Sequence, residues 1–474
     1  MFFKHIYEPG LAHASYLVGC QATGEAIVID PKRDIQDYLT IAEQEKMKIT
    51  KIAETHIHAD FLSGSLELAK ATGAQIFASD EGGAEWQYEF DHVGLKDGNT
   101  FMVGNLKFEV LHTPGHTPEH ISFLLTDTPA SNQPIMIFTG DFVFVGDVGR
   151  PDLLEKAAGY IGTKEAGAKQ MFQSLKKFKA LSDHIQVWPA HGAGSACGKA
   201  LGAVPSSTVG YEKLVNWALG YDNEEEFVVA LLEGQPEPPK YFAMMKKLNK
   251  SNRNVLYPVP ETQPLSIEEF LVAKEKGYKI IDTRNKISFA GGHINGSINI
   301  QDNSAFSTWA GWLLSYEEPF ILIAPSHRIN QLRTALLRIG LDNISGYLPD
   351  IEILTNAGME LETLNQITAD ELHSNLDKFN ILDVRNESER ISARIKDSQF
   401  IFAGYIVENA FKIDNSKPVV VHCAGGDRSS IAASILQCMG YKNIINLTGG
   451  INAWISHGFD VEKGIELVEE VSTE

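Results

Sequence analysis

The second half of the chain repeats itself, and this repeat constrains the fold more than any other feature of the sequence. The segment IIDTRNKISF, which contains Asp282, is similar to ILDVRNESER, which contains Asp383. A second pair of similar segments follows: EPFILIAPSHRINQLRTALLRIGLDNI in the first copy and KPVVVHCAGGDRSSIAASILQCMGYKNI in the second. A period of about 100 residues is too long for a solenoid and indicates two tandem copies of one small domain.

Each copy shows a buried strand, a loop, a helix and a further strand, the pattern of a doubly wound parallel α/β sheet. We place the copies at residues 263–360 and 361–474. A segment rich in proline and polar residues, 236–262, precedes them and is interpreted as a linker along the surface. Residues 1–235 alternate β-rich runs with helical segments and form the first domain. The sequence therefore predicts three α/β domains.

The composition excludes several classes of protein. With 43% hydrophobic and 22% charged residues the chain is an ordinary globular protein, and 474 residues suit about three domains. A formal charge of -20 and a pI of about 5.2 argue against nucleic acid or an anionic membrane as a partner, so any anionic substrate needs local positive charge. The sequence shows no apolar run of ~20 residues, no secretory signal and only four cysteines. We therefore expect a cytoplasmic protein.

Histidine and aspartate residues follow four predicted strands of the first domain. They lie in the segments THIHAD, PGHTP, FTGD and PAHG. Loops at strand ends converge at one edge of a sheet, so side chains that are distant in the sequence can meet there and bind a metal ion. One such residue would be a weak signal, but the ordered set of four segments predicts a metal site. The residues concerned are His56, His58, Asp60, His116, Asp141 and His191.

Phe61 limits how many ions this site can hold. A second ion would need a histidine at this position, and the phenyl ring instead provides an apolar wall. Two histidines and one carboxylate on one face of Fe(II) leave three coordination positions open, which suits a reaction between O2 and a thiolate. Zinc accepts the same ligands. The residues by themselves thus favour one ion and leave iron and zinc as alternatives.

These motifs, together with GRPD at residues 149–152, resemble those of the persulfide dioxygenases of the metallo-β-lactamase fold over residues 1–235. The resemblance implies an αββα sandwich and one Fe(II) per chain. In that family two histidines and one carboxylate bind the iron, and their positions match His56, His116 and Asp141. The residues expected to flank the iron without binding it are His58, Asp60 and His191.

Two further residues of the first domain are candidates for handling the substrate. Arg150, in the GRPD motif, offers a fixed cation for the carboxylate or phosphate of a thiol substrate, or it braces its loop as an ion pair with Asp152. Cys197 follows His191 in a loop of small residues. It is either a buried, inert thiol or an exposed auxiliary thiol that handles sulfur. The sequence leaves both pairs of alternatives open.

Cys423 in the second copy is the candidate nucleophile. It ends an apolar strand and precedes Gly425 and Gly426, which let the loop curl so that backbone N–H groups point inward. These groups and the N-terminus of the following helix form a cradle for negative charge, an environment that lowers the pKa of a thiol. Four residues separate Cys423 from Arg428, a tight ring that suits a sulfur atom better than a phosphate group. Asp427 would oppose a thiolate unless Arg428 pairs with it.

This loop, with ILDVR and LTGGINAW, resembles the active loop of rhodanese sulfurtransferases over residues 361–474. The middle copy has Ala324 where the second has Cys423, and no glycines follow. It therefore cannot transfer sulfur by a cysteine mechanism, and we interpret it as a spacer or an interface. The substrate-binding residues that the resemblance implies are Gly425, Gly426 and Arg428.

Over its whole length the chain resembles bacterial fusions of a persulfide dioxygenase with two rhodanese-like domains, the first without its cysteine. The resemblance implies that the Fe(II) domain oxidises a small thiol persulfide with O2 to sulfite, and that the rhodanese domain makes or uses thiosulfate, as in sulfide detoxification. We expect a homo-oligomer without nucleic-acid or membrane partners. The alternatives are a zinc thioester hydrolase of the glyoxalase II kind fused to a sulfurtransferase, and a rhodanese pair that serves only as a binding module.

Overall fold

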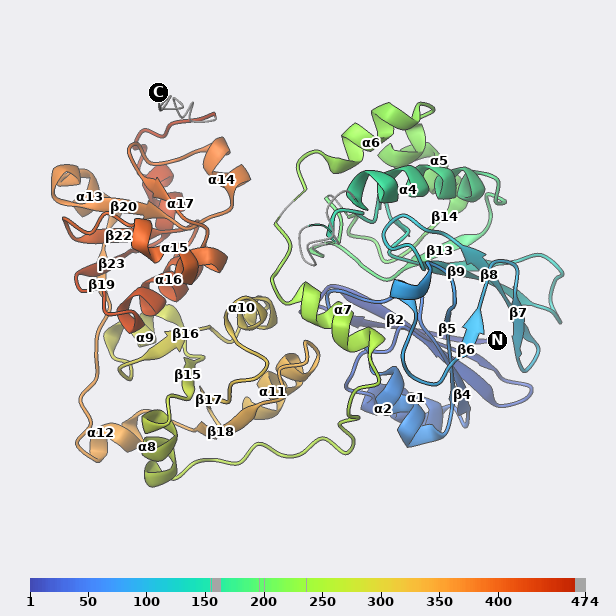
Figure 1. The fold of residues 1–474 in the computed structure, drawn as a ribbon, viewed down its shortest axis with the longest axis horizontal. Helices are drawn as coiled ribbons and strands as arrows, with labels where there is room; N and C mark the ends of the chain where they lie inside the picture. Colours follow the sequence, from blue (N-terminus) through green and yellow to red (C-terminus); the bar gives the residue numbers. More distant parts are fainter. Residues whose placement is uncertain (154, 156–162, 196, 200, 236, 465–474) are drawn as a thin grey trace. The chain divides into compact units, whose positions relative to one another are not determined.

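The computed structural model describes residues 1–474 except 154, 156–162, 196, 200, 236 and 465–474 (Figure 1). The chain divides into two compact units. Within the described ranges no helix is long and apolar enough to cross a membrane. The first unit comprises Met1–Pro260 with Thr334–Asp342, and the second comprises Glu261–Arg333 with Asn343–Glu474.

Two six-stranded sheets face each other in the first unit (Figure 1). In spatial order, the first contains β1 (Phe2–Glu8), β2 (His13–Cys20), β3 (Glu25–Ile29), β4 (Lys48–Ala53), β5 (Gln75–Ser79) and β6 (Val93–Leu95). The second contains β14 (Ser207–Thr208), β13 (Gln186–Pro189), β10 (Met136–Gly140), β9 (Ile121–Asp127), β8 (Leu106–His112) and β7 (Thr100–Val103). A separate hairpin pairs β11 (Val143–Phe144) with β12 (Asp147–Val148).

Helices cover both outer faces of this pair of sheets (Figure 1). Helices α1 (Gln36–Gln44) and α2 (Ser65–Thr72) pack on the first sheet, and α4 (Thr163–Lys179), α5 (Val209–Val215) and α6 (Glu224–Leu232) pack on the second. The first unit is therefore the αββα sandwich that the resemblance implied, and this expectation is confirmed.

Burial on both faces explains why the strands of this unit are nearly uninterrupted apolar runs. Every residue of β2 is buried, and its side chains alternate between two cores. Tyr16 and Val18 point into the core between the sheets, whereas Leu17 points toward the helix layer. Large rings such as Phe108 and Phe138 fill the space between the sheets. The two sheets, and hence the loops at their ends, are held in one arrangement by this packing.

The segment 236–262 differs from the surface linker that the sequence predicts. It contains helix α7 (Phe242–Lys250), whose residues Phe242 and Met245 are buried. Proline at 236–262 is concentrated at the two ends, and the average composition of the segment conceals the short amphipathic helix between them. Helix α7 is thus part of the packed structure of the first unit.

Asn249 on α7 holds the loop that follows β4. Its side-chain amide donates to the carbonyl oxygens of His58 (2.8 Å) and Phe61 (2.7 Å). Its side-chain oxygen accepts from the backbone N–H of Ser63 (2.8 Å). Because this loop carries the HIHAD motif, the helix braces the candidate metal site from behind.

The second unit contains two parallel sheets, one for each copy of the repeat. In spatial order, the first sheet contains β16 (Ser297–Asn299), β15 (Lys279–Asp282), β17 (Phe320–Ile323) and β18 (Ile344–Leu348). The second contains β19 (Asn365–Ile367), β23 (Ile444–Leu447), β22 (Val419–His422), β20 (Asn380–Asp383) and β21 (Gln399–Phe400). The helices of the first copy are α8 (Ile267–Glu275), α9 (Lys286–Gly291), α10 (Phe306–Leu313), α11 (Ile329–Leu337) and α12 (Glu352–Asn356). Those of the second are α13 (Ala369–His373), α14 (Glu387–Ser392), α15 (Ile406–Asn409), α16 (Asp427–Cys438) and α17 (Gly450–Ser456).

The repeat seen in the sequence recurs in the contacts of both copies. Arg284 pairs with Asp282 in the first copy (2.5 Å), and Arg385 pairs with Asp383 at the same place in the second (2.6 Å). The two copies also share one hydrophobic core, in which Phe289 of α9 packs with aliphatic residues of the second copy. The prediction of two rhodanese-like α/β domains is confirmed.

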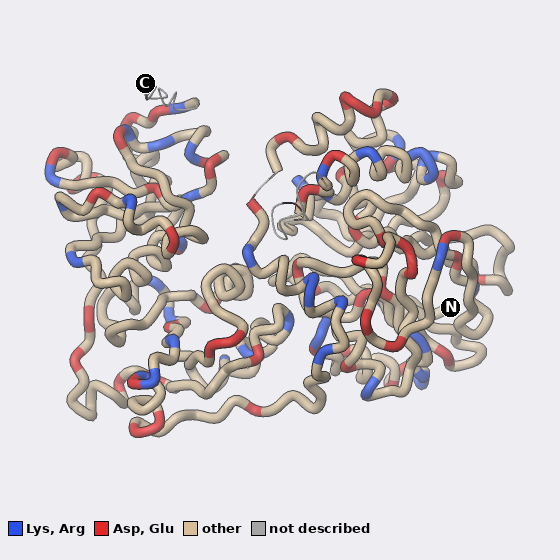
Figure 2. Tube along the Cα trace, in the orientation of Figure 1, with Lys and Arg blue, Asp and Glu red and all other residues tan. Residues whose placement is uncertain are grey.

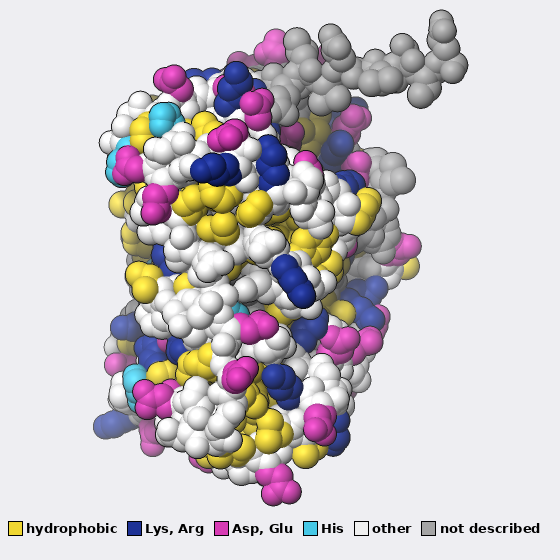
Figure 3. Space-filling model, turned by 90° about the vertical axis from the view of Figure 1, so that its left-hand side faces the viewer, with side chains coloured by type: hydrophobic (Ala, Val, Ile, Leu, Met, Phe, Trp, Pro, Cys, Tyr) yellow, Lys and Arg dark blue, Asp and Glu magenta, His cyan; other side chains and the backbone are white. Residues whose placement is uncertain are grey.

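Charged residues of both signs are distributed along the whole trace (Figure 2). The face in Figure 3 likewise mixes acidic, basic and apolar side chains, without a large patch of one sign. This pattern is that of a solvated surface. An anionic substrate is therefore more readily attracted by local groups at a site than by the overall field.

We predict that Asn249→Ala destabilises the first unit by roughly 2–4 kcal/mol, because it leaves two buried carbonyl oxygens and one N–H without their partner. Urea unfolding followed by tryptophan fluorescence measures the effect. The control is Asn252→Ala, an exposed residue just beyond the same helix. Equal unfolding curves for the two variants would contradict the bracing role of α7.

Candidate metal centre and cysteine loop

Four buried side chains converge at the strand ends of the first unit. Nε2 of His116 lies 3.4 Å from Oδ2 of Asp141, and Nε2 of His56 lies 3.8 Å from the same oxygen. Nε2 of His191 lies 3.3 Å from the other oxygen, Oδ1. One ligand atom each from His56, His116 and Asp141 lies within 4.8 Å of the others, which is close enough to hold one ion.

The second ring nitrogen of each histidine is engaged behind the site. Nδ1 of His116 donates to the carbonyl oxygen of Arg150 (2.9 Å), and Nδ1 of His191 donates to that of Ala12 (3.1 Å). Nδ1 of His56 is bonded to the hydroxyl of the preceding threonine (3.0 Å). These bonds fix the ring orientation and leave each Nε2 facing inward with a free lone pair, as in metal-binding histidines.

The inward atoms have the properties of metal ligands. Nε2 of His56, Nε2 of His191 and both carboxylate oxygens of Asp141 have no hydrogen-bond partner among the residues that the structure describes. A buried polar atom without a partner costs roughly 1–3 kcal/mol, and a cation would remove this cost. Imidazole nitrogen and carboxylate oxygen are ligands of both iron and zinc. The residues therefore fit a metal ion and do not select between these two.

The protonation states agree with ligand roles. Burial, with a smaller effect of neighbouring histidines, lowers the pKa of His56 well below its usual value, and burial also lowers the pKa of His116. Burial alone would raise the pKa of Asp141, but His191 and His116 outweigh it and lower that pKa. Neutral imidazoles beside an ionised carboxylate are the state that binds a cation.

A second group of possible ligands adjoins the first. Nε2 of His191 lies 3.3 Å from Oδ2 of Asp60, and both lie with the thiol of Cys197 within 4.8 Å of one another. Phe61 forms the apolar wall that the sequence predicts, and its ring centre lies 3.9 Å from that of His13. The sequence predicts Cys197 as an inert or an auxiliary thiol, and its place among possible metal ligands is seen only in the structure. A second ion is thus not excluded by Phe61 alone.

Cys197 is buried, with 1% of its surface exposed. Burial and the nearby carboxylates of Asp141 and Asp60 raise the pKa of its thiol well above the usual value. Of the two alternatives for Cys197, the structure favours the buried thiol over the exposed one.

His58 is directed away from the three-residue group. Its Nε2 lies 3.2 Å from Asp30 and 3.2 Å from Glu54, whose carboxylate also accepts hydrogen bonds from Ser63 and Ser65. Burial alone would lower the pKa of His58, but the two carboxylates outweigh it and raise that pKa well above its usual value. Asp30, Glu54 and His58 thus form a buried group of their own that could hold a cation, separate from the group around Asp141.

Two residues of the PGHTPEH segment support the site, and the sequence analysis did not assign them. Nε2 of His120 accepts a hydrogen bond from the backbone N–H of Asp141 (3.1 Å), so it positions that ligand. The buried carboxylate of Glu119 accepts from the backbone N–H of Ile57 (2.8 Å), between the two histidines of the HIHAD loop. Their position three and four residues after His116, in the same loop, is the sequence feature that could have indicated this supporting role.

The surroundings of Arg150 favour one of its two alternative roles. Its side chain is fully buried and forms two hydrogen bonds with Asp152, at 2.7 and 2.6 Å. Its carbonyl oxygen accepts the bond from His116 described above. The alternative in which Arg150 braces its loop is therefore favoured over direct binding of a substrate. An incoming anion would need a solvent-exposed charge, and the charge of Arg150 is buried.

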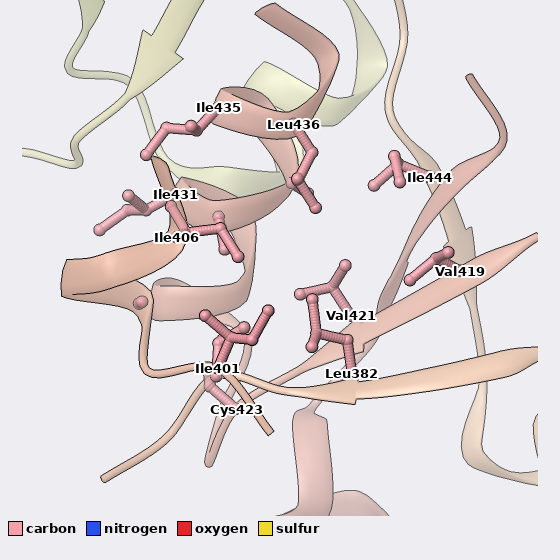
Figure 4. Close-up of a cluster of buried hydrophobic side chains, with 14 of the residues drawn as sticks. Leu382, Ile401, Ile406, Val419, Val421, Cys423, Ile431, Ile435, Leu436 and Ile444 are labelled. Carbon is pink, nitrogen blue, oxygen red and sulfur yellow. The ribbon is translucent and has the colours of Figure 1, made fainter. Parts of the chain in front are cut away.

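Cys423 lies at the end of β22, and 1% of its surface is exposed. Its sulfur accepts hydrogen bonds from the backbone N–H of Gly426 (3.1 Å) and from the hydroxyl of Ser429 (3.6 Å). Gly426 has φ +103°, which a residue with a side chain rarely adopts. Figure 4 shows Cys423 beside Ile401, at one end of the aliphatic cluster between β22 and α16. The sulfur thus meets one backbone N–H and one hydroxyl group at the N-terminus of α16.

The charged residues of this loop pair differently from the expectation. The sequence left open whether Arg428 pairs with Asp427, and in the structure Arg428 forms two hydrogen bonds with Glu389, at 2.5 and 2.7 Å. Asp427 instead accepts a hydrogen bond from the ammonium group of Lys286 (2.6 Å). Lys286 belongs to the middle copy and was not a candidate, because its partner lies 141 residues away in the sequence.

The middle copy has no comparable loop. Ala324 is buried directly after β17, at the place that Cys423 occupies after β22. Arg328 pairs there with Asp302 (2.6 Å). Without a thiol at this position the middle copy has no nucleophile for sulfur transfer by this route.

Two family models match the chain. The model described as the metallo-beta-lactamase superfamily matches residues 9–191. The model described as the rhodanese-like domain matches residues 266–350 and 368–457.

Known proteins are similar to different parts of the chain. A crystal structure of a metallo-beta-lactamase from Staphylococcus aureus subsp. aureus COL is 46% identical, covers 73% of this chain and 98% of its own, and has a TM-score of 0.68. Hydroxyacylglutathione hydrolase of Rhodospirillum rubrum is 35% identical over 37% of this chain, which spans 60% of the length of that relative. Persulfide dioxygenase ETHE1, mitochondrial, of Bos taurus is 27% identical over 40% of this chain and 68% of its own length.

We predict that Glu119→Gln makes the stability of the first unit less dependent on pH. Burial raises the pKa of Glu119 from 4.5 to about 7. Since the folded protein holds this proton more tightly than the unfolded chain, the contribution is complete below pH 4.5 and is lost as the pH rises through 7. The uncharged amide avoids this loss, so the variant should gain about 3 kcal/mol over the unaltered protein at pH 8 and little at pH 5.

Urea unfolding at several pH values between 5 and 8 measures this difference, with the exposed Glu43→Gln as the control. A constant difference between Glu119→Gln and the unaltered protein across that range would rule out an uncharged Glu119 in the folded state.

Proposed function

Since the chain belongs to the metallo-beta-lactamase superfamily and carries two rhodanese-like domains after that domain, we propose that it is a two-site sulfur enzyme. In this proposal the first domain is an Fe(II) persulfide dioxygenase that oxidises the persulfide of a small thiol to sulfite. The last domain is a sulfurtransferase in which Cys423 carries sulfur to or from sulfite.

The observation that carries the dioxygenase proposal is the position of His58. Because Asp30 and Glu54 hold His58 away, two histidines and one carboxylate face the site from the HIHAD, PGHTP and FTGD segments. This ligand set, with open positions on the other side, is typical of non-haem Fe(II) oxygenases. The similarity to a persulfide dioxygenase supports the same choice of reaction.

The net reaction of the first site would be RSSH + O2 + H2O → RSH + SO3²⁻ + 2H⁺, in which four electrons pass from the outer sulfur to O2. A bound ferrous ion would supply the redox chemistry between O2 and a thiolate. His56 and His116 would hold the ion through Nε2, and the bonds from their Nδ1 atoms keep both rings in place. Asp141 would supply the negative charge among the ligands, with its backbone held by His120.

At the second site, Cys423 would take the outer sulfur of the small-thiol persulfide, whose own S–S bond breaks: Cys–S⁻ + RSS⁻ + H⁺ → Cys–S–S⁻ + RSH. It would then pass this sulfur to sulfite: Cys–S–S⁻ + SO3²⁻ → Cys–S⁻ + S2O3²⁻. The S–S bond of the persulfide breaks as the new S–S bond forms, and the electron pair stays on the cysteine sulfur. The N–H of Gly426 and the hydroxyl of Ser429 would stabilise that thiolate. Sulfite made at one site would thus be consumed at the other, which gives a chemical reason for the fusion.

A zinc-dependent thioester hydrolase is the second candidate for the first domain. The group of Asp60, His191 and Cys197 beside the first three residues favours it, because it could hold a second ion. The similarity to hydroxyacylglutathione hydrolase also supports a thioester hydrolase. In that case metal-bound hydroxide chemistry on a carbonyl carbon would replace oxidation of sulfur.

Metal analysis and oxygen uptake distinguish these proposals. We expect about one iron per chain and O2 consumption that requires a persulfide such as glutathione persulfide. His116→Ala should lose at least ~10-fold in iron content and O2 uptake, since it removes a ligand and not only a supporting group. His184→Ala, at an exposed histidine that bonds the carbonyl oxygen of Pro134, is the control. Two zinc ions per chain with hydrolysis of a glutathione thioester and no O2 uptake would reject the dioxygenase.

Cys423→Ser tests the second site separately. We expect this variant to keep O2 uptake with persulfide and to lose transfer of sulfur between thiosulfate and sulfite or cyanide, because serine cannot form a persulfide. Sulfite should then accumulate as the product. Unchanged thiosulfate turnover in Cys423→Ser would show that the rhodanese pair serves another purpose, such as binding a partner.

A further inference from the structure

The middle copy, which has no nucleophile, contributes a charged group to the cysteine loop of the last copy. Nζ of Lys286, the first residue of α9, donates to the carbonyl oxygen of Gly425 (2.7 Å) and to the carboxylate of Asp427 (2.6 Å). Both bonds reach the segment between Cys423 and Arg428. Lys286 is thus placed on the candidate active loop of the neighbouring domain.

We propose that Lys286 is a positioning residue for Cys423, and that the middle copy is required in order to supply it. Lys286 orients one peptide group of the cysteine loop and offsets the negative charge of Asp427. Both effects favour the thiolate and an anionic sulfur compound at this site. This inference deepens the proposed sulfurtransferase function and rests on it.

The first effect follows from the geometry of one peptide group. The carbonyl oxygen of Gly425 and the N–H of Gly426 belong to the same planar trans peptide, so they point in opposite directions. Lys286 holds the carbonyl oxygen on the outer side. The N–H is thereby directed toward the sulfur of Cys423, which it reaches at 3.1 Å. Because both neighbouring residues are glycines, side chains do little to hold this peptide, and an external anchor is needed.

The second effect concerns the charge balance of the loop. A thiolate at Cys423, with Asp427 and Glu389, would place three negative charges near one another. Arg428 is bonded to Glu389 through two nitrogens and also interacts with the sulfur of Cys423, so its charge is shared between these two groups and Asp427 pairs with a different cation. Lys286 supplies it. The pair is partly solvated, with side-chain exposures of 30% for Lys286 and 54% for Asp427, so water screens it and the expected effect is moderate.

The packing of α9 against the last copy holds Lys286 next to the cysteine loop. Phe289 and Ala290, on the same helix as Lys286, are buried in the core of the last copy. On the next strand of the middle copy, the side chain of Asn299 accepts from the hydroxyl of Ser430 (2.8 Å). The helix that carries Lys286 is therefore fixed against the domain that carries Cys423.

The repeat itself shows that this lysine is particular to the middle copy. Aligning DTRNK with DVRNE places Lys286 opposite Glu387. The loss of the cysteine at Ala324 and the presence of a cation at Lys286 thus occur in the same copy. A domain that has lost its own nucleophile can in this way remain necessary for that of its neighbour.

The test is a pH titration of the Cys423 thiolate in the full-length protein. Thiolate absorbance in the ultraviolet is measured for each variant against the same variant carrying Cys423→Ser, so that only this cysteine is followed. Lys286→Gln should raise the pH midpoint by about 0.5–1 unit, which means about threefold to tenfold less thiolate at a given pH below the midpoint. Lys286→Arg should restore most of the original midpoint, because it keeps the charge.

Lys276→Gln, at an exposed lysine of the same copy, is the matched control and should leave the midpoint unchanged. Circular dichroism shows whether each variant keeps its fold.

Asp427→Asn removes the charge that Lys286 offsets, so Lys286→Gln should shift the midpoint less in that background than in the unaltered protein. Equal shifts in both backgrounds would overturn the charge effect, and an unchanged midpoint in Lys286→Gln would overturn the whole inference.

The titration needs no substrate, so it separates this inference from the proposed reaction. A shifted midpoint in a protein that does not transfer sulfur would retain the positioning role of Lys286 and reject the sulfurtransferase. Sulfur transfer with an unshifted midpoint would retain the sulfurtransferase and reject the positioning role of Lys286.

Discussion

The buried nitrogen and oxygen atoms that face one another at the strand ends of the first unit are the constraint on which that domain depends. Each polar atom buried without a partner costs roughly 1–3 kcal/mol, and here several are gathered around Asp141. The packed sandwich and the hydrogen bonds behind each ligand hold them in place despite this cost. The residues of this centre fit a cation that would satisfy these atoms, so binding of a metal ion should increase the stability of the domain.

The two candidate sites use the same physical device. In the metal centre, a hydrogen bond on the outer side of each ring, such as that from His116 to the carbonyl of Arg150, turns the other nitrogen inward. In the cysteine loop, the bond from Lys286 to the carbonyl of Gly425 turns the N–H of the same peptide toward the sulfur. In both cases a rigid planar group is oriented from behind, so the atom that faces the site is held in one direction.

Much of this architecture could be predicted because local sequence patterns indicate it. The repeat around Asp282 and Asp383 predicts two similar domains, and the HIHAD loop predicts a metal site, since strand-end loops meet at one sheet edge. The prediction of a surface linker at 236–262 was wrong in part. Composition does not reveal that Asn249 has partners in the HIHAD loop. The role of Arg150 stayed open because a guanidinium can serve a substrate or an aspartate equally well until its burial is known.

The sequence by itself determined which chemical groups are available: imidazoles and carboxylates in the first domain, a thiol in a glycine loop in the last, and none in the middle copy. Only the tertiary structure decided which of these groups face one another. His58 was turned toward Asp30 and Glu54, Cys197 was brought to Asp60, and Lys286 was placed on a loop 141 residues away in the sequence. The reason is that ligand identity is a property of single residues, whereas partner choice depends on distances of a few ångströms that packing between distant segments sets.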